Sequence, residues 1–240
     1  IFTVSMLDIV KNTFHSIAHL FFPQLCLGCG RDTVQNDEPI CIECLYQLPA
    51  THFEHIENNA VSKALVGRVP FTQASALYYF TKQSILQSLI FQLKYKQQSN
   101  VGLALGKLMG QKLAESKLYE AVDVCIPLPL HPKKLRKRGY NQAQLLCEGI
   151  QSVWNKPILN HAVIRQRNTK TQTKKSRMHR WENMDGVFVV RNEQLLMHKH
   201  ILLVDDVMTT GASVEAFYQA VQHILGMKIS ICTLAYTSGM

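Results

Sequence analysis

Apolar and polar residues follow two different periodicities along most of this chain. Short apolar runs at 74–80, 122–126, 163–165, 186–190, 201–204 and 228–236 predict strands, while helical spacing of apolar positions at 84–95, 101–116, 141–154 and 213–225 predicts helices. Strands that alternate with helices are typical of a parallel sheet covered by helices. We therefore expect an α/β fold with a mainly parallel sheet for residues 51–240.

The first 50 residues have a different pattern. Apolar positions between Leu7 and Phe21 lie on one face of a predicted helix, and charged residues and histidines interrupt them. We expect residues 1–23 to form a packing helix rather than a signal peptide, and we expect no membrane span and a cytoplasmic protein. Residues 24–50 are expected to form a small module of their own. The polar stretch 51–59 is expected to be a linker.

The module contains two C-x-x-C pairs, Cys26 with Cys29 and Cys41 with Cys44, separated by eleven residues. Each pair can present two thiolates from one tight turn, and four thiolates fill the coordination shell of a structural zinc ion. A redox role of the thioredoxin kind is the alternative, but the motif occurs twice and no βαβ unit adjoins it. We predict a structural Zn²⁺ site, whose binding would also stabilise so short a segment.

The net charge of +9 is concentrated in one part of the chain. The net positive charge of the window between His131 and Trp181 exceeds that of the whole protein, and the only acid in this window is Glu148. Such a window favours anionic partners, either a pyrophosphate or the backbone of a nucleic acid. Two segments overlap this window. Residues 127–143 are expected to be a basic loop after a strand, and the segment from Arg165 to Phe188 is expected to be a mobile flap.

A phosphate-binding motif follows the predicted strand 201–204. Asp205 and Asp206 stand at the end of this strand, and the segment from Met208 to Ser213 leads into the next helix. A loop between a strand and a helix N-terminus presents unpaired backbone N–H groups to an anion. Gly211 allows close approach to a ligand, and the hydroxyls of this segment can donate to phosphate oxygens. A capped turn without a ligand is the alternative interpretation.

The ordered string of four apolar residues, two acids and T-T-G resembles the phosphoribosyl-pyrophosphate (PRPP) signature of type I phosphoribosyltransferases. This resemblance implies that Asp205 and Asp206 bind the ribose hydroxyls. It further implies that the loop binds the 5′-phosphate through residues Met208, Thr209, Thr210, Gly211, Ala212 and Ser213.

Further motifs extend the resemblance to nearly the whole chain. They are the paired C-x-x-C, L-K-Y at 93–95, P-L-P-L-H-P-K-K-L-R-K-R-G-Y-N-Q-A at 127–143 and R-Q-R-N-T-K-T-Q-T at 165–173. Together they resemble the ComF family, whose members are phosphoribosyltransferase-like proteins linked to bacterial DNA uptake and natural transformation.

Two functions follow from this resemblance. In the first, the protein serves DNA uptake: it binds PRPP or a related nucleotide, and it binds single-stranded DNA, with a competence helicase or recombination loader as a possible partner. In the second, it is an active phosphoribosyltransferase with an unidentified nucleophile. In both, Mg²⁺ accompanies PRPP, and Lys133, Arg136 and Arg138 are expected to hold phosphate groups. Tyr140 could stack on a base.

Overall fold

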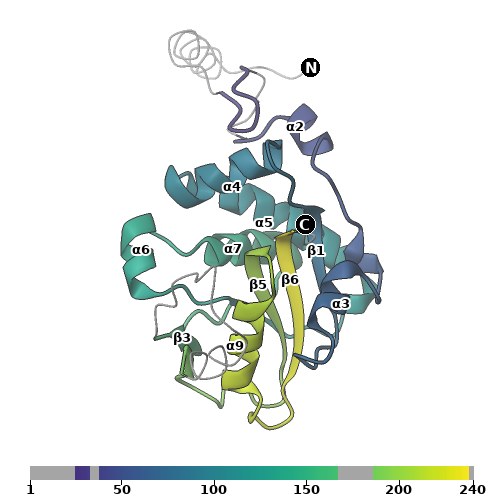
Figure 1. Cartoon of the computed structure of the whole chain (residues 1–240), viewed down its shortest axis with the longest axis vertical. Coiled ribbons are helices and arrows are strands. Elements are labelled where there is room, and N and C mark those ends of the chain that lie inside the picture. The colour runs from purple at the N-terminus through teal and green to yellow at the C-terminus, as the bar shows by residue number, and fades with distance from the viewer. Residues whose placement is uncertain (1–24, 33–37, 167–185, 238–240) are drawn as a thin grey trace, which may run out of the picture.

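The computed structural model describes residues 25–32, 38–166 and 186–237, and a parallel sheet forms its centre (Figure 1). Hydrogen bonds join its four strands in the spatial order β1 (Ala74–Tyr79), β6 (Lys228–Tyr236), β5 (His200–Met208) and β2 (Val124–Pro127). Every pair of neighbours is parallel. The predicted α/β class with a mainly parallel sheet is therefore confirmed.

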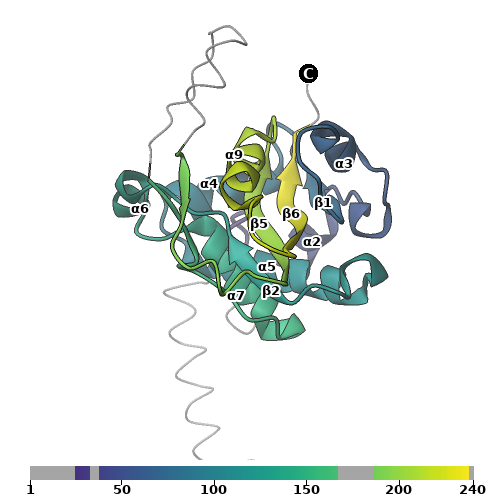
Figure 2. The same ribbon diagram turned by 90° about the horizontal axis from the view of Figure 1, so that it is seen from below.

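Helices cover both faces of this sheet, which explains why its strands are apolar on both sides. Leu202 and Val204 of β5 belong to one buried cluster, and Ile201 and Leu203 belong to the other. The first cluster is covered by α4 (Ile85–Tyr95), α5 (Ser99–Glu115) and α7 (Gln142–Trp154). The second is covered by α3 (Ala60–Leu65) and α9 (Ala212–Val221). Figure 2 shows the strands between these two layers.

Glycines bring α5 and α7 unusually close together. A Cβ atom on Gly106 would lie 2.4 Å from the carbonyl oxygen of Leu146, and one on Gly149 would lie 2.4 Å from that of Leu103. Because the contact is with backbone, neither helix can make room by rotating a side chain. The absence of a side chain at these positions thus sets the distance between the two helices.

Replacing Gly149 with alanine is expected to push α5 and α7 apart. Overpacking of this kind costs about 1–3 kcal/mol, which outweighs the gain of up to about 1 kcal/mol in helix propensity. Chemical denaturation should therefore show a lower free energy of unfolding for Gly149→Ala. Gln151→Ala, on the exposed side of α7, is the matched control and should change it by less than about 0.5 kcal/mol. An unchanged midpoint for Gly149→Ala would contradict the close contact.

The polar stretch 51–59 is not the linker that its composition predicts. The backbone N–H of Thr51 donates to the carbonyl of Leu77 in β1 over 2.9 Å, and its hydroxyl donates to Ala76. Asn59 donates to the carbonyl of Ala74 over 2.8 Å and also caps α3. These side chains are polar because they satisfy backbone groups along β1. The segment, including η1 (Phe53–His55), is fixed to the sheet.

The basic segment 127–143 contains a helix where a loop was expected. This helix, α6 (Pro132–Arg138), begins with Pro132 at its first position, where no N–H is needed. The ring of His131 accepts from the backbone N–H of Lys133 over 3.1 Å, and Gly139 ends the helix with a φ of 84°. These local caps explain how a run of like charges remains helical.

Four further short elements complete the described part of the chain. α2 (Ile42–Tyr46) lies in the cysteine module, and the short strands β3 (Val163–Arg165) and β4 (Phe188–Val190) pair antiparallel. η2 (Lys117–Tyr119) follows α5. The predicted helix 1–23 and the central part of the predicted flap, residues 167–185, lie outside the described residues. Within the described ranges, no helix has both the length and the apolarity to cross a bilayer.

Candidate functional site

The predicted phosphate-binding segment lies at the carboxyl end of β5, in the position that open α/β sheets use for ligands. Thr209 and Thr210 are exposed, and α9 begins after Gly211 without a side-chain cap on its first turn. Gly211 has a φ of 74°, and a Cβ there would lie 2.7 Å from Leu65. This position therefore requires glycine, and the helix N-terminus is left open to an anion.

Arg68 holds this segment in place from a distant part of the chain. Its Nη1 donates to the carbonyl oxygen of Thr210 over 2.6 Å, and its Nε and Nη2 donate to Glu215 over 3.1 and 2.5 Å. The ion pair also neutralises the acid in the first turn of α9, so its charge opposes a bound phosphate less. Sequence reasoning missed Arg68, because no local pattern connects it with a loop 142 residues away.

The two acids lie inside β5, since the strand continues to Met208 instead of ending at Val204 as predicted. Successive side chains of a strand point to opposite faces, so Asp205 and Asp206 lie on different sides. Asp206 is buried and forms an ion pair with Lys94 of α4, with 3.0 Å from Nζ to Oδ1 and 2.9 Å to Oδ2. The L-K-Y motif thus contributes its lysine to the site, a role that the sequence did not reveal.

Asp205 has a different environment, which disfavours its ionised form. Burial and then the charge of Asp206 raise its pKa to about 7, although the nearby charges of Lys94 and Arg165 act in the opposite direction. One of its oxygens accepts from the backbone N–H of Asp206 over 2.8 Å. Asp205 therefore titrates close to neutral pH in the protein without ligand.

The raised pKa of Asp205 predicts a pH-dependent stability. The native state holds this proton more tightly than the unfolded chain, whose value is near 3.8, so stability is lost as pH rises from about 4 to 7. Asp205→Asn should raise the free energy of unfolding near pH 8 by at most about 4 kcal/mol, and should change it little near pH 4. Urea unfolding at both pH values measures this. Glu120→Gln, at an exposed acid, is the control, and equal gains at both pH values would contradict the prediction.

The basic residues of α6 divide into two groups. Lys133 and Arg136 are exposed to solvent, whereas Lys134 and Arg138 are half-buried. Burial and the charges of Arg165, Arg138 and Lys94 lower the pKa of Lys134, so these four cations lie near one another. Asp206 acts on Lys134 in the opposite direction. The structure therefore adds Lys134 to the three predicted residues, and it places this half-buried cation near Asp206 of β5.

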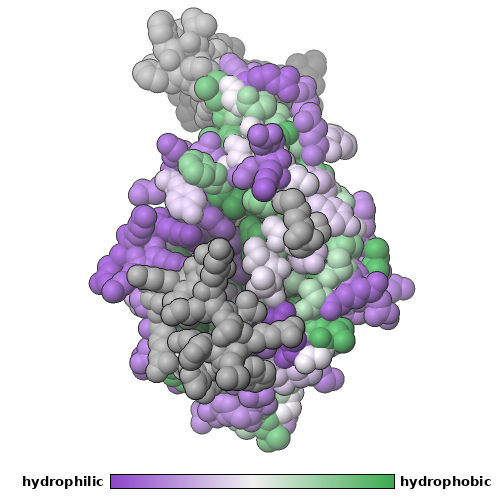
Figure 3. Space-filling view, viewed as in Figure 1, coloured by the Kyte–Doolittle hydropathy of each residue, from purple (hydrophilic) through white to green (hydrophobic). Residues whose placement is uncertain are grey.

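These side chains give one face of the molecule a strongly hydrophilic surface. Figure 3 shows it at the side where Figure 1 places α6. Arg138 donates to Gln142 over 2.7 Å, and its guanidinium lies 5.7 Å from the ring centre of Tyr95. Tyr140 is half-buried, and its hydroxyl donates to the carbonyl of Leu93 over 2.7 Å. Its hydroxyl therefore anchors α4 to the segment after α6.

The four cysteines of the module come together as their spacing predicts. Their sulfur atoms all lie within 4.8 Å of one another, with 3.7 Å between Cys26 and Cys44 and 3.9 Å between Cys29 and Cys41. Four sulfurs around one zinc at about 2.3 Å would be about 3.8 Å apart at the corners of a tetrahedron. The donor set and its spacing therefore fit a structural zinc ion.

Hydrogen bonds stabilise negative charge on part of this cluster, whereas burial opposes it at Cys44. The sulfur of Cys26 accepts from the backbone N–H groups of Gly28 and Cys41 over 3.3 and 3.2 Å. Hydrogen bonds from the backbone and side chain of Arg31 lower the pKa of Cys29 to about 6, while burial and the neighbouring thiols raise that of Cys44. The module packs on α4, since a Cβ on Gly28 would lie 3.1 Å from Ile85.

Comparison with known proteins identifies the relatives of this chain. No family model matches it. Competence protein F of Haemophilus influenzae is 31% identical over 226 residues, which are 90% of this chain and 92% of that protein. The chain belongs to the competence protein F (ComF) family. The ComF resemblance predicted from the motifs is thereby confirmed.

Two further relatives agree with this assignment. DNA utilization protein YhgH of Shigella flexneri is 30% identical over 198 residues, 81% of this ComF chain and 82% of YhgH. Competence protein ComFC of Bacillus subtilis is 35% identical over 101 residues, 42% and 39% of the two chains. The shared length is thus greatest for the Haemophilus protein and shortest for the Bacillus one.

Two solved enzyme structures are similar to this ComF chain at a more distant level. The alignment with glutamine PRPP amidotransferase of B. subtilis covers 57% of this chain and 26% of that protein, with a TM-score of 0.39 and 15% identity. Adenine phosphoribosyltransferase of Leishmania tarentolae covers 74% and 88%, with a TM-score of 0.37 and 11% identity.

Proposed function

We propose that this ComF protein acts in the cytoplasm during DNA uptake and that it binds two phosphate-bearing ligands. One is PRPP or a related nucleotide, at the segment from Asp205 to Ser213. The other is single-stranded DNA, along the basic side chains of α6. The names of its relatives, competence protein F and DNA utilization protein, support the general role. A competence helicase or a recombination loader would be a fitting partner.

The observation that carries this proposal is the meeting of opposite charges at one end of the sheet. The open N-terminus of α9 and the hydroxyls of Thr209 and Thr210 can bind a phosphate. Beside them are the two acids of β5, together with a group of cations from α4, α6 and β3. A ligand with both a sugar and phosphates matches this combination, whereas inorganic phosphate alone would leave the acids unused.

The proposed role of each side chain follows from its position. Asp205 and Asp206 would accept hydrogen bonds from the ribose hydroxyls, while the segment Met208–Ser213 would hold the 5′-phosphate. Lys134 lies near Asp206, and together with the neighbouring Arg138 it would hold the pyrophosphate. Lys133 and Arg136 are exposed and suited to a longer backbone. Mg²⁺, when bound with PRPP, would offset part of the negative charge of the pyrophosphate. Arg68 would keep the loop in position.

Phosphoribosyl transfer is a second candidate, favoured by the presence of both acids together with several half-buried cations. Cations near the pyrophosphate would stabilise the charge that develops as it leaves the ribose. Release of pyrophosphate from PRPP, measured with and without single-stranded DNA and common nucleobases, would distinguish transfer from binding.

Removing the exposed charges of α6 tests the DNA-binding part. The double variant Lys133→Ala with Arg136→Ala should bind labelled single-stranded DNA more weakly. Its affinity should also depend less on salt, with a slope reduced by about 1.4, since each phosphate contact on a single strand contributes about 0.7. Fluorescence anisotropy at several salt concentrations measures both quantities.

The matched control is Lys107→Ala with Lys117→Ala, which likewise removes two exposed charges, from α5 and η2. The control should keep nearly the affinity and slope of the wild type. If the two double variants lost affinity equally, binding would reflect the overall charge and the assignment to α6 would be wrong.

A further inference from the structure

The outer face of α4 carries an aromatic pair that packing of the core does not require. Leu86, Leu89, Ile90 and Leu93 form the buried side of this helix. Phe91 and Tyr95, one turn apart on the opposite side, are 50% and 56% exposed. Their ring centres are 5.2 Å apart with an angle of 44° between the planes. Two neighbouring exposed rings of this kind offer a surface on which planar groups can stack.

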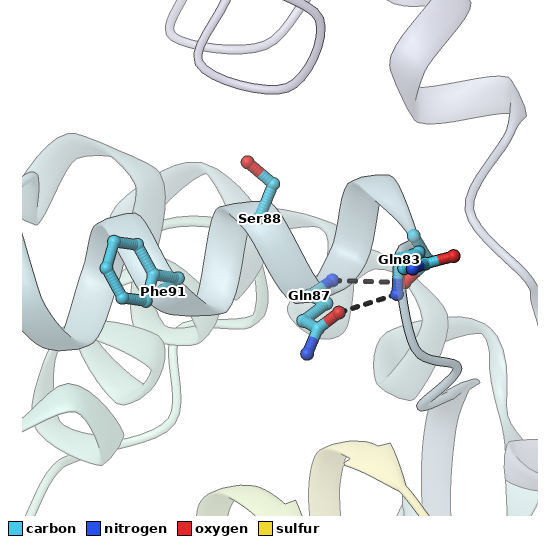
Figure 4. Close-up of a pocket in the computed structure, with 5 residues that line it drawn as sticks. Gln83, Gln87, Ser88 and Phe91 are labelled. Atoms are coloured by element: carbon cyan, nitrogen blue, oxygen red, sulfur yellow. Dashed lines mark hydrogen bonds between the residues drawn. The ribbon is translucent and has the colours of Figure 1, made fainter.

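A pocket on the same helix continues this surface. Its volume is about 400 Å³, and its lining consists of Gln83, Ser84, Gln87, Ser88 and Phe91 (Figure 4). The side-chain oxygen of Gln87 accepts from the backbone N–H of Gln83 over 2.6 Å. Figure 4 shows the amide nitrogen of Gln87 pointing away from the helix. Amides and hydroxyls beside an aromatic ring can contact the edge and the face of a base.

Positive charge borders the aromatic pair on one side. The guanidinium of Arg138 lies 5.7 Å from the ring centre of Tyr95, which connects α6 to α4. Lys134, on the same short helix, lies near Lys94 of α4. Rings next to a row of cations complement a polymer whose bases alternate with phosphates. A neutral apolar partner would make no use of the positive charge of Lys134 and Arg138.

We propose that the outer face of α4 is the base-binding surface for single-stranded DNA, with Phe91 and Tyr95 stacking on bases and α6 contacting the phosphates between them. This inference rests on the DNA binding proposed above and adds where the bases lie. The pocket lined by Gln83, Ser84 and Gln87 holds a base at one end of this surface. Stacking of this kind tolerates any sequence, because every base has an aromatic face.

The test compares two labelled strands of equal length, an oligothymidylate and a strand of abasic residues with the same phosphates. Phe91→Ala with Tyr95→Ala should weaken binding of the oligothymidylate at least about fivefold. The affinity of this variant for the abasic strand should equal that of the wild type. The salt slope should also be unchanged, since no phosphate contact is removed. Both side chains are half-exposed, and circular dichroism verifies that the variant is folded.

Leu225→Ala is the matched control, because it removes an apolar side chain that is 63% exposed and lies between α9 and β6. It should bind both strands like the wild type. Equal affinity of the aromatic variant and the wild type for oligothymidylate would overturn the base-binding surface, while DNA binding through α6 would stand. Equal losses on both strands would also overturn it. A wild type that binds neither strand would overturn the DNA-binding proposal as well.

Discussion

The double variant Asp205→Asn with Asp206→Asn is expected to lose PRPP binding while it stays folded. Each carboxylate would accept a hydrogen bond from a ribose hydroxyl, and hydrogen bonds to charged groups contribute about 1.5–3 kcal/mol each. Losing both should weaken binding at least about 100-fold. Isothermal titration with magnesium PRPP measures the affinity. Thermal unfolding verifies that the variant is folded. We expect the fold to tolerate the change, because Lys94 loses its ion-pair partner but keeps some contact with solvent.

Asp123→Asn is the matched control for this experiment. Asp123 is the residue before β2, and its carboxylate accepts from the backbone N–H of His200, at the first residue of β5 and therefore at the opposite end of the sheet from the phosphate loop. It should bind PRPP like the wild type. Unchanged PRPP affinity in the double variant would show that the acids of β5 are not part of the ligand site.

Replacing Cys26 with serine is expected to remove zinc from the protein and to unfold the cysteine module. Structural zinc sites of four cysteines contribute about 10–16 kcal/mol of apparent binding energy, far more than a short segment obtains from its own core. Elemental analysis should find about one zinc per wild-type chain and close to none in Cys26→Ser. Proteolysis between residues 38 and 50 should become faster, which mass spectrometry of the fragments detects.

Cys147→Ser is the matched control, since Cys147 is a buried cysteine of α7 outside the cluster. It can lower stability by placing a hydroxyl in the core, but its zinc content should equal that of the wild type. A wild-type protein that is folded over residues 38–50 without any metal would show that the four sulfurs serve another purpose.

Local signals predicted most of the fold because its strands and helices have strong patterns. The strands β1, β2 and β6 and the helices α4, α5 and α7 begin and end within about two residues of the predicted positions. The helix α6 was not predicted, because its prolines and its run of lysines and arginines resemble a basic loop and its capping residues were not recognised. The strand β5 was predicted too short, since two acids are unusual inside a buried strand. Asp206 is tolerated there because Lys94 neutralises it.

The candidate site was predictable only where its residues are neighbours in the sequence. The string from Asp205 to Ser213 and the two C-x-x-C pairs are local motifs, and the structure shows the first as a strand, loop and helix and the second as one cluster. Lys94, Arg68 and Lys134 come from other elements. Their roles depend on tertiary packing, which brings α4, α6 and the turn after α3 to one end of the sheet and which no spacing along the chain encodes.

The most direct test of the central claim is a competition between the two proposed ligands. Labelled single-stranded DNA bound to the wild type is titrated with magnesium PRPP at a low and a moderate salt concentration. If DNA binding is salt-sensitive and PRPP displaces the DNA, both ligands bind at the carboxyl end of β5, beside α6 and α9. DNA binding that PRPP does not affect at either salt concentration would contradict the assignment of both ligands to the cations of α6.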